Sequence, residues 1–245
     1  DIIRQWFKKN LPSLLKERSD VAEEFLASPY VYDFYRFEGN AQSLRIVSKL
    51  HDFKGEFDGL DLTAATLNTI LKYTYPSSHK KTEEITSKKV GYFFAEEEAF
   101  KTVTEITGAG TSRHPLTFIL EAADDIAYLV ADMEDAIGKG VISFRDVREF
   151  LIENLSTDAY NAPHSVHTRE VLTTIDEKVF SVNRFFVDLR DKLIDGARHN
   201  FVNHYDEIMA GTFNQDLFKN SWAEDLYVIL RKLSEERIYD NKGIL

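Results

Sequence analysis

The chain has 245 residues, 43% of them hydrophobic and 13% aromatic, which is enough for a sizeable core built from Phe, Tyr, Leu and Ile. Its net charge of -11 argues against nonspecific nucleic-acid binding through bulk charge and leaves open only a local basic patch for single-stranded nucleic acid. The absence of cysteine excludes disulfides, thiolate metal sites and cysteine nucleophiles, and it is compatible with the cytoplasmic location that we expect. No apolar run reaches the roughly 18 residues of a membrane span, so we expect no membrane partner.

Apolar residues recur at spacings of three and four, which predicts a nearly all-helical chain. The expected helices of the first half cover residues 2–9, 20–26, 42–50, 63–73 and 94–106, with Asp20 and Thr63 at helix starts. Pro12 is expected to open a separate turn. The polar, basic stretch 75–89 is predicted to be a loop, and the glycines at 108 and 110 to end the fifth helix.

In the second half, Pro115 suits the first turn of a central helix that ends near Gly138. Ser143 and Asp146 have the spacing of a capping box for a helix that reaches Leu155. A loop at 157–164 and a long helix at 166–209, broken near Gly196, are expected to follow. The last helix is expected to carry Trp222, Leu226, Ile229, Leu230 and Leu233. Without an internal repeat or linker, the sequence predicts a single helical domain over 1–245.

The central helix places acidic groups inside an otherwise apolar segment. Residues four apart share a helix face, so Asp124, Tyr128 and Asp132 form one stripe. The residues expected mainly on the other side are Ile119, Ala123, Ile126, Val130, Met133 and Ile137. Spacing alone favours an amphipathic helix with a solvated acidic face. The alternative is a metal carboxylate followed by a tyrosine and a second acid that contact a substrate.

Six short words, in order along most of the chain, resemble the deoxyguanosine triphosphate triphosphohydrolases of the HD-domain superfamily. They are FEGNAQ at 37–42, ILKYT at 70–74, KKVGY at 88–92, PLT at 115–117, AADDIAY at 122–128 and AGTFN at 210–214. The resemblance implies an all-α bundle of the HD-domain type, of which this chain would be the central and C-terminal part. The N-terminus lacks an initiator Met and is no signal peptide, so we expect a fragment.

The resemblance also implies a divalent metal, Mn or Mg, held by a His, an adjacent His-Asp pair and a final Asp. Asp124 matches the final Asp, whereas the other ligands and the catalytic His and Glu would precede Asp1. His51-Asp52 follows the FEGNAQ word instead of preceding it, so we interpret it as a helix end. The remaining histidines considered are expected at the surface or in caps: His164, His167, His199 and His204.

By the same resemblance, Tyr128 and Asp132 match residues that contact the deoxyribose, and Asn40 matches a polar residue beside the substrate. Lys72 and Lys89 match lysines that reach the triphosphate. Each residue has a structural alternative: Tyr128 as a core tyrosine, Asn40 as a helix N-cap, and the lysines as solvated side chains. The residues expected to support these neighbours are Glu38, Gln42 and Asp125.

The implied activity is metal-dependent hydrolysis of a deoxynucleoside triphosphate, dGTP, to deoxynucleoside and tripolyphosphate, by a homo-oligomer that is a hexamer in the family. Because three ligands are expected upstream, we expect the chain alone to be inactive. Two alternatives stay open: an HD phosphohydrolase with another phosphoester substrate, and a non-catalytic helical nucleotide-binding or assembly module. No P-loop, GxGxxG, HExxH or GxSxG motif competes with these readings.

Overall fold

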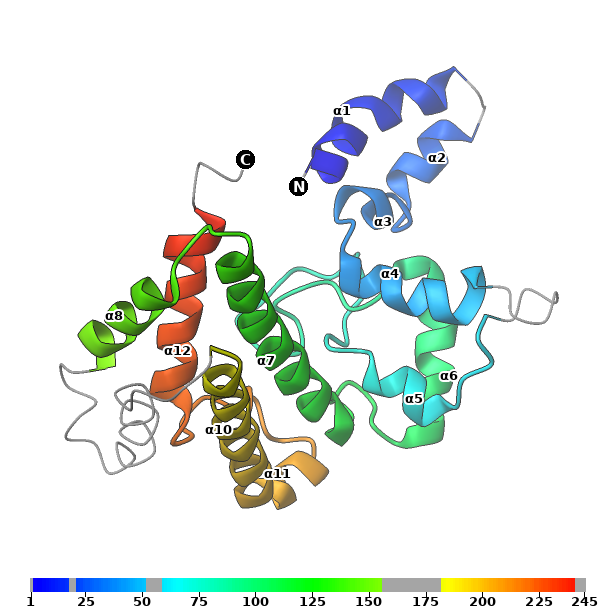
Figure 1. Ribbon diagram of the computed structural model, residues 1–245. Helices are drawn as coiled ribbons and strands as arrows, with labels where there is room; N and C mark the ends of the chain where they lie inside the picture. The colour runs from blue at the N-terminus through cyan, green and yellow to red at the C-terminus, as the bar shows by residue number, and fades with distance from the viewer. Residues whose placement is uncertain (1, 18–20, 52–58, 156–181, 241–245) are drawn as a thin grey trace. The chain divides into compact units, whose positions relative to one another are not determined.

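A computed structural model of the protein describes residues 2–17, 21–51, 59–155 and 182–240 (Figure 1). Every regular element in these ranges is a helix, and an isolated bridge between Pro76 and Tyr92 is the only strand-like pairing there. The expected all-α class is therefore confirmed, while the HD-type arrangement stays a prediction. Backbone packing divides the chain into two compact units, residues 1–120 with 206–214 and residues 121–205 with 215–245. The single-domain expectation stays a prediction.

Three helices open the first unit: α1 (Ile2–Lys16), α2 (Ala22–Ala27) and α3 (Val31–Tyr35). Phe7 and Phe25 both pack edge-on against Phe34, with ring centroids 5.1 and 5.9 Å away. Such aromatic pairs stabilise a fold beyond their buried area. They join the three helices into one small layer.

The sequence-based boundaries of the first two helices were partly wrong. α1 continues through Pro12 instead of ending near residue 9. Its packing at Phe7 and the buried Leu11 offsets the one backbone hydrogen bond that Pro12 cannot donate. Val21 occupies the N-cap of α2 without a side-chain bond, and Asp20 lies outside the described residues.

This unit also contains α4 (Gly39–Arg45), the π-helical η1 (Ile46–Leu50), α5 (Ala64–Thr69), the 3-10 turn η2 (Phe94–Glu96), α6 (Glu97–Thr107) and most of α11 (Tyr205–Met209). The Thr63 hydroxyl caps α5 by accepting from the Thr66 N–H at 3.3 Å, as predicted. α5 ends at Thr69, a few residues earlier than expected. Gly108 ends α6 in the left-handed region at φ 73°, where a glycine costs least.

Residues 70–93 form an irregular segment, as the loop prediction required, and buried carboxylates hold it. Asp33, 6% exposed, accepts hydrogen bonds from the Phe94 and Ala95 N–H groups at 2.6 and 3.2 Å and from the Ser77 hydroxyl. Glu96, 2% exposed, receives two hydrogen bonds from the Arg45 guanidinium at 3.0 and 2.8 Å. A buried carboxylate needs such partners, so both contacts fix α3 and α4 relative to η2.

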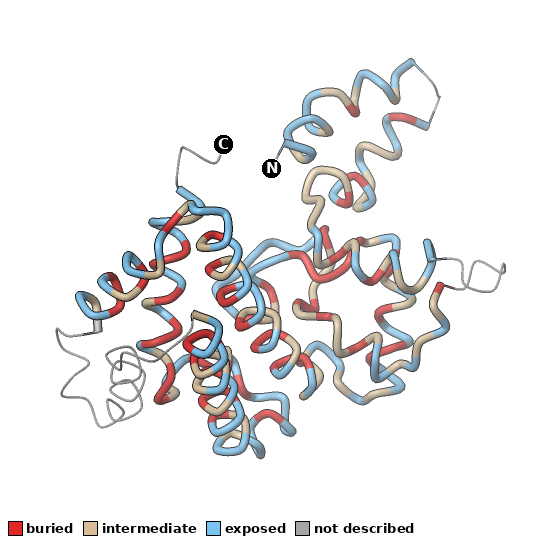
Figure 2. The backbone as a smooth tube through the Cα atoms, in the orientation of Figure 1, coloured by how far each residue is buried: buried red, intermediate tan, exposed pale blue. Residues whose placement is uncertain are grey.

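The second unit contains most of α7 (Pro115–Gly138), together with α8 (Phe144–Leu155), α10 (Val182–Asn203), α12 (Glu224–Leu233) and the π-helical η4 (Ser234–Tyr239). α7 begins and ends at Pro115 and Gly138 as predicted. The Ser143–Asp146 capping box is confirmed: the Ser143 N–H donates to the Asp146 carboxylate at 2.8 Å, and the Asp146 N–H donates to the Ser143 hydroxyl at 3.1 Å. Buried residues alternate with exposed ones along these helices (Figure 2).

Two expectations for the C-terminal half were wrong. α10 does not break at Gly196; it ends at Asn203, and α11 (Tyr205–Met209) follows His204. A Cβ on Gly196 would lie 2.3 Å from the Ala223 Cβ, so the glycine serves close packing. Trp222 precedes the last helix instead of belonging to it. The expected loop at 157–164 lies outside the described residues, as does the first part of the expected long helix.

None of the helices in the described ranges has the length and apolar character needed to cross a membrane.

Candidate functional site

The acidic stripe forms on α7 as predicted, within the second unit. Asp124, Tyr128 and Asp132 follow one another at four-residue spacing on a single helix. Tyr128 is 63% exposed, whereas the two carboxylates are half-buried. The alternative that placed Tyr128 in the core is therefore wrong. The side chain is accessible to a ligand.

The buried side of α7 is rotated from the one expected. Ile126, Val130 and Met133 are buried as predicted, but Ile119 is 45% exposed and Ala123 is exposed. Ala122, Leu129 and Ala136 are buried instead, and they turn the apolar side of the helix away from Ile119 and Ala123. The stripe remains on the polar side, so the rotation leaves its exposure intact.

Asp132 accepts a hydrogen bond from a hydroxyl that comes from another element. The donor is the Tyr239 hydroxyl at the end of η4. Burial, the hydrogen bond to Asp132 and the negative charges around it raise the pKa of Tyr239 to about 12. The Asp132 carboxylate is thus oriented to accept an O–H donor, which is the chemistry that a sugar hydroxyl offers.

Asp125, the neighbour of Asp124, has a structural partner. Its carboxylate accepts a hydrogen bond from the Tyr227 hydroxyl of α12 at 2.7 Å. Burial of the Tyr227 ring and this bond both raise the pKa of Tyr227. The support that the sequence assigned to Asp125 is therefore a tie between α7 and α12, and Tyr227 is a residue that sequence reasoning missed.

Among the described residues, no three or more His, Asp or Glu side chains gather in a way that could hold a metal ion. Asp124 is half-buried and would contribute one carboxylate to such a site. His51 is exposed just after η1, in agreement with a helix end, and His199 is exposed beside the Asn203 amide at 3.1 Å. Asp52, His164 and His167 lie outside the described residues.

Asn40, Lys72 and Lys89 lie in the first unit. Asn40 is the second residue of α4, and Glu38 occupies the N-cap, so the N-cap alternative for Asn40 was wrong. Its amide donates to the Glu38 carboxylate at 3.5 Å, and Glu38 is ion-paired with Arg4 at 2.8 Å. Glu38 therefore supports Asn40, as predicted.

The segments that contain the three motifs with Asn40, Lys72 and Lys89 meet in the core of this unit. Ala41 packs with Val90 and Phe93 in one buried cluster. Leu44 and Leu71 pack with Tyr92 in a second cluster. Segments that are far apart in sequence thus converge on residues 90–93.

Backbone contacts bring the two lysine-bearing segments side by side. A Cβ on Gly91 would lie 1.9 Å from the Tyr73 carbonyl oxygen, so only glycine permits this approach. The Gly91 N–H donates to the Tyr75 carbonyl at 2.9 Å. Lys72 is half-buried and Lys89 is exposed. The two lysines therefore lie on neighbouring backbone segments. Such a local pair of cations is what the binding of a polyanion would require.

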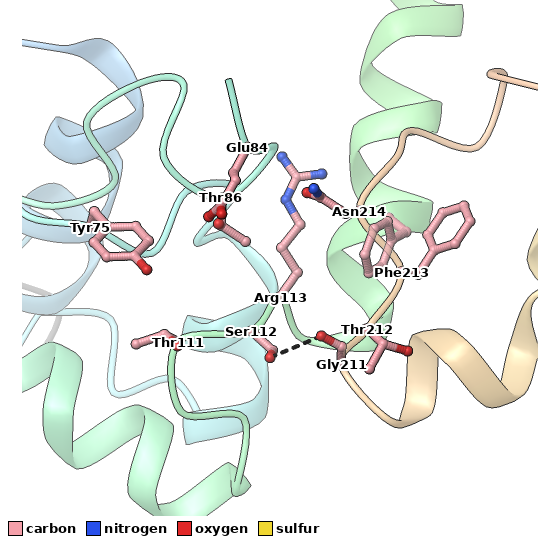
Figure 3. Close-up of a pocket in the computed structure, with 11 residues that line it drawn as sticks. Tyr75, Glu84, Thr86, Thr111, Ser112, Arg113, Gly211, Thr212, Phe213 and Asn214 are labelled. Atoms are coloured by element: carbon pink, nitrogen blue, oxygen red, sulfur yellow. Dashed lines mark hydrogen bonds between the residues drawn. The ribbon is translucent and has the colours of Figure 1, made fainter. Parts of the chain in front are cut away.

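A polar pocket of about 240 Å³ lies in the same unit (Figure 3). It is lined by Tyr75, Glu84, Thr86, Thr111, Ser112, Arg113, Phe118, Gly211, Thr212, Phe213 and Asn214. The AGTFN word thus supplies four of the lining residues. Arg113 and Asn214 were given no role by the sequence, because their partners are distant along the chain.

Comparison with curated proteins finds similar chains over nearly the whole length, whereas no family model matches. The chain is 41% identical to a deoxyguanosinetriphosphate triphosphohydrolase-like protein of Listeria monocytogenes, over 99% of this chain and 52% of the relative. It is 32% identical to a deoxyguanosinetriphosphate triphosphohydrolase of Yersinia enterocolitica, over 94% of this chain and 47% of the relative. A probable deoxyguanosinetriphosphate triphosphohydrolase of Pseudomonas aeruginosa is 31% identical over 89% of this chain and 47% of its own length.

The chain is therefore similar to proteins whose names describe hydrolases of a nucleoside triphosphate. The particular relatives are named dGTP triphosphohydrolase or dGTP triphosphohydrolase-like, which confirms the resemblance found in the sequence. The chain spans about half the length of the curated relatives that it matches.

Proposed function

We propose that this chain supplies the substrate contacts of a metal-dependent enzyme that hydrolyses a deoxynucleoside triphosphate, dGTP, to deoxynucleoside and tripolyphosphate. The similarity to proteins with that name supports the proposal. The observation that carries it is the convergence of the segments bearing Asn40, Lys72 and Lys89 on residues 90–93. Local patterning cannot bring such distant words together, so their meeting in the fold supports a shared role.

Lys72 and Lys89 are proposed to contact the triphosphate, with Asn40 beside the substrate. A chain of net charge -11 repels a polyanion at long range, so binding requires cations held locally. The close approach of Gly91 to Tyr73 keeps the two lysine-bearing segments together. Hydrogen bonds from ammonium to phosphate are charge-assisted and are stronger than neutral ones.

Tyr128 and Asp132 are proposed to contact the deoxyribose. Tyr128 is 63% exposed and can stack on a sugar, and its ring can exclude a 2′-hydroxyl by packing at C2′. Asp132 can accept the 3′-hydroxyl as it accepts the Tyr239 hydroxyl. The pair would therefore prefer a deoxynucleotide to a ribonucleotide.

The described residues do not by themselves fit a catalytic metal. Asp124 would provide one carboxylate ligand, and the described part of the chain gathers no group of three. The Mn or Mg implied for the enzyme would polarise the α-phosphate and activate water when bound. We assign no step of the reaction to it, and the roles proposed for this chain are binding and orientation. We also propose that this enzyme is a homo-oligomer and that it acts in the cytoplasm.

A calorimetric titration of the chain with dGTP, GTP and deoxyguanosine tests this function. We expect dGTP to bind more tightly than GTP, because of the sugar contacts, and more tightly than deoxyguanosine, because of the phosphate contacts. Equal affinity for dGTP and GTP would contradict the roles of Tyr128 and Asp132. Equal affinity for dGTP and deoxyguanosine would contradict the roles of the lysines. Failure to bind any of the three would overturn the proposal for this chain.

A further inference from the structure

Arg113 is a charged residue in the turn between α6 and α7, and it is only 3% exposed. A guanidinium is expensive to remove from water unless its donors find acceptors. The residues around it therefore determine what it does. Arg113 and its hydrogen-bond partners belong to the first unit.

The guanidinium holds two backbone segments through their carbonyl groups. Its Nε donates to the Lys72 carbonyl at 2.7 Å, and its Nη2 donates to the Ile85 carbonyl at 3.5 Å. The rings of Tyr73 and Phe118 lie 5.6 and 5.5 Å from the guanidinium carbon. Arginine suits this position because its donors form a rigid planar fork and its face stacks on aromatic rings.

Asn214 also binds the segment that contains Ile85. Its side-chain oxygen accepts a hydrogen bond from the Ile85 N–H at 3.1 Å. Figure 3 shows the Arg113 side chain extending between the Glu84–Thr86 side of the pocket and Asn214. The peptide groups of Ile85 are thus held by two side chains from distant parts of the sequence, and Arg113 also donates to the Lys72 carbonyl.

We propose that Arg113 is a positioning residue that sets the direction of the Lys72 side chain by fixing the backbone at Lys72. This inference rests on the proposed function, in which Lys72 contacts the triphosphate. A hydrogen bond to a carbonyl group restrains the peptide plane, and the peptide plane determines where the adjacent side chain points. Arg113 acts through Lys72 and does not itself touch the substrate.

The test is a double-mutant cycle on the full chain with dGTP and deoxyguanosine as probes. Arg113→Lys keeps the charge but replaces the fork by a single point donor. We expect it to weaken dGTP binding about three- to tenfold, the size of one hydrogen bond, and to leave deoxyguanosine binding unchanged. In a Lys72→Ala background the same substitution should have no further effect, because the group that it orients is gone.

The matched control is Arg36→Lys. Arg36 also donates to loop carbonyls, those of Ser77 and His79 at 2.9 and 2.6 Å, and these two residues follow Lys72 further along the loop. We expect this variant to leave the ratio of dGTP to deoxyguanosine affinity unchanged. If Arg36→Lys changed that ratio as much as Arg113→Lys does, general loosening of the loop would replace positioning as the explanation.

A second measurement needs no ligand. Amide hydrogen exchange at residues 70–75 should accelerate in Arg113→Lys and stay at the wild-type rate in Arg36→Lys. Unchanged exchange there, or additive losses in the cycle, would overturn the inference. If Lys72→Ala itself has no effect on dGTP binding while exchange behaves as expected, the proposed phosphate contact fails and the tie between Arg113 and Lys72 stands.

Discussion

The Tyr227 hydroxyl donates a hydrogen bond to the Asp125 carboxylate at 2.7 Å and so ties α12 to α7. Two adjacent acids of one helix therefore have different surroundings. Asp125 is engaged with a tyrosine that is only 8% exposed, whereas Asp124 belongs to the stripe that continues through Tyr128 and Asp132. The resemblance gave Asp124 a ligand role and left Asp125 as a support, and the structure gives that support a partner.

Removing this tie should destabilise the second unit. Tyr227→Phe deletes the donor and leaves a partly buried carboxylate without it, so we expect the free energy of unfolding to fall by about 1.5–3 kcal/mol. Urea denaturation followed by circular dichroism measures the change. Tyr205→Phe, at a ring that is 51% exposed, is the control and should leave the midpoint unchanged. Equal midpoints for wild type and Tyr227→Phe would show that the bond contributes nothing.

Asparagine substitutions at the two acids should separate metal binding from stability. In the proposed metal-dependent enzyme, Asp124→Asn should lower metal content and activity by orders of magnitude, because it removes the carboxylate that is proposed as a ligand. Asp125→Asn should act mainly on the thermal midpoint through Tyr227. Metal content is measured by elemental analysis after gel filtration. Unchanged metal content in Asp124→Asn would remove Asp124 from the ligand set.

Tyr128 should control the choice between deoxyribose and ribose. Because its ring is 63% exposed, Tyr128→Ala should cost little stability, and its effect on binding can be measured cleanly. We expect weaker dGTP binding and a narrower gap between dGTP and GTP. Calorimetry with both nucleotides gives the ratio. A ratio that matches the wild type would mean that Tyr128 does not contact the sugar.

The lysines should act on the phosphates alone. Each charge-assisted hydrogen bond is worth about 1.5–3 kcal/mol, so Lys72→Ala and Lys89→Ala should each lower dGTP affinity by about ten- to a hundredfold. Deoxyguanosine binding should barely change. Lys101→Ala is the control, since Lys101 is an exposed lysine of the same unit that pairs with Glu97 at 3.0 Å. Equal losses for both ligands would indicate misfolding and not a lost phosphate contact.

Local sequence signals predicted the parts of this fold that local interactions determine. The Thr63 cap, the Ser143–Asp146 capping box and the left-handed Gly108 each depend on residues within a few positions. The stripe on α7 follows from helical periodicity in the same way. These are the features that one sequence can show without any knowledge of the tertiary structure.

Tertiary contacts decided what the sequence could not show. Gly196 was predicted to break a helix, but its small size serves the approach of Ala223. Arg113 carries no local signal, and the motif that contains Asn214 does not reveal its role, since their partners lie 41 and 129 residues away. In the candidate site, the residues were proposed from motif matches, whereas the partners of Asp125 and Asp132 on α12 and η4 required the structure.

The contact between Tyr239 and Asp132 should appear as a delayed ionisation. Burial first, then the hydrogen bond to Asp132, raises the pKa of Tyr239 from 10.0 in the unfolded chain to about 12 in the folded one. A raised pKa means that the folded state keeps a proton which the unfolded state releases. The stability from this contact is therefore fully present below about pH 10 and is lost as pH rises through about 12.

Phenolate absorbance measured against pH, in wild type and in Tyr239→Phe, isolates this group. We expect the difference between the two titrations to show one phenol that ionises near pH 12, and an Asp132→Asn background should move that ionisation toward pH 10. The effect on unfolding should be small, because Tyr239 is 53% exposed and solvent screens the interaction. If the difference titration instead centres on pH 10 in the protein that retains Asp132, the Tyr239 hydroxyl does not form a hydrogen bond to Asp132 in solution. The argument that this carboxylate is oriented to accept a sugar hydroxyl would then lose its support.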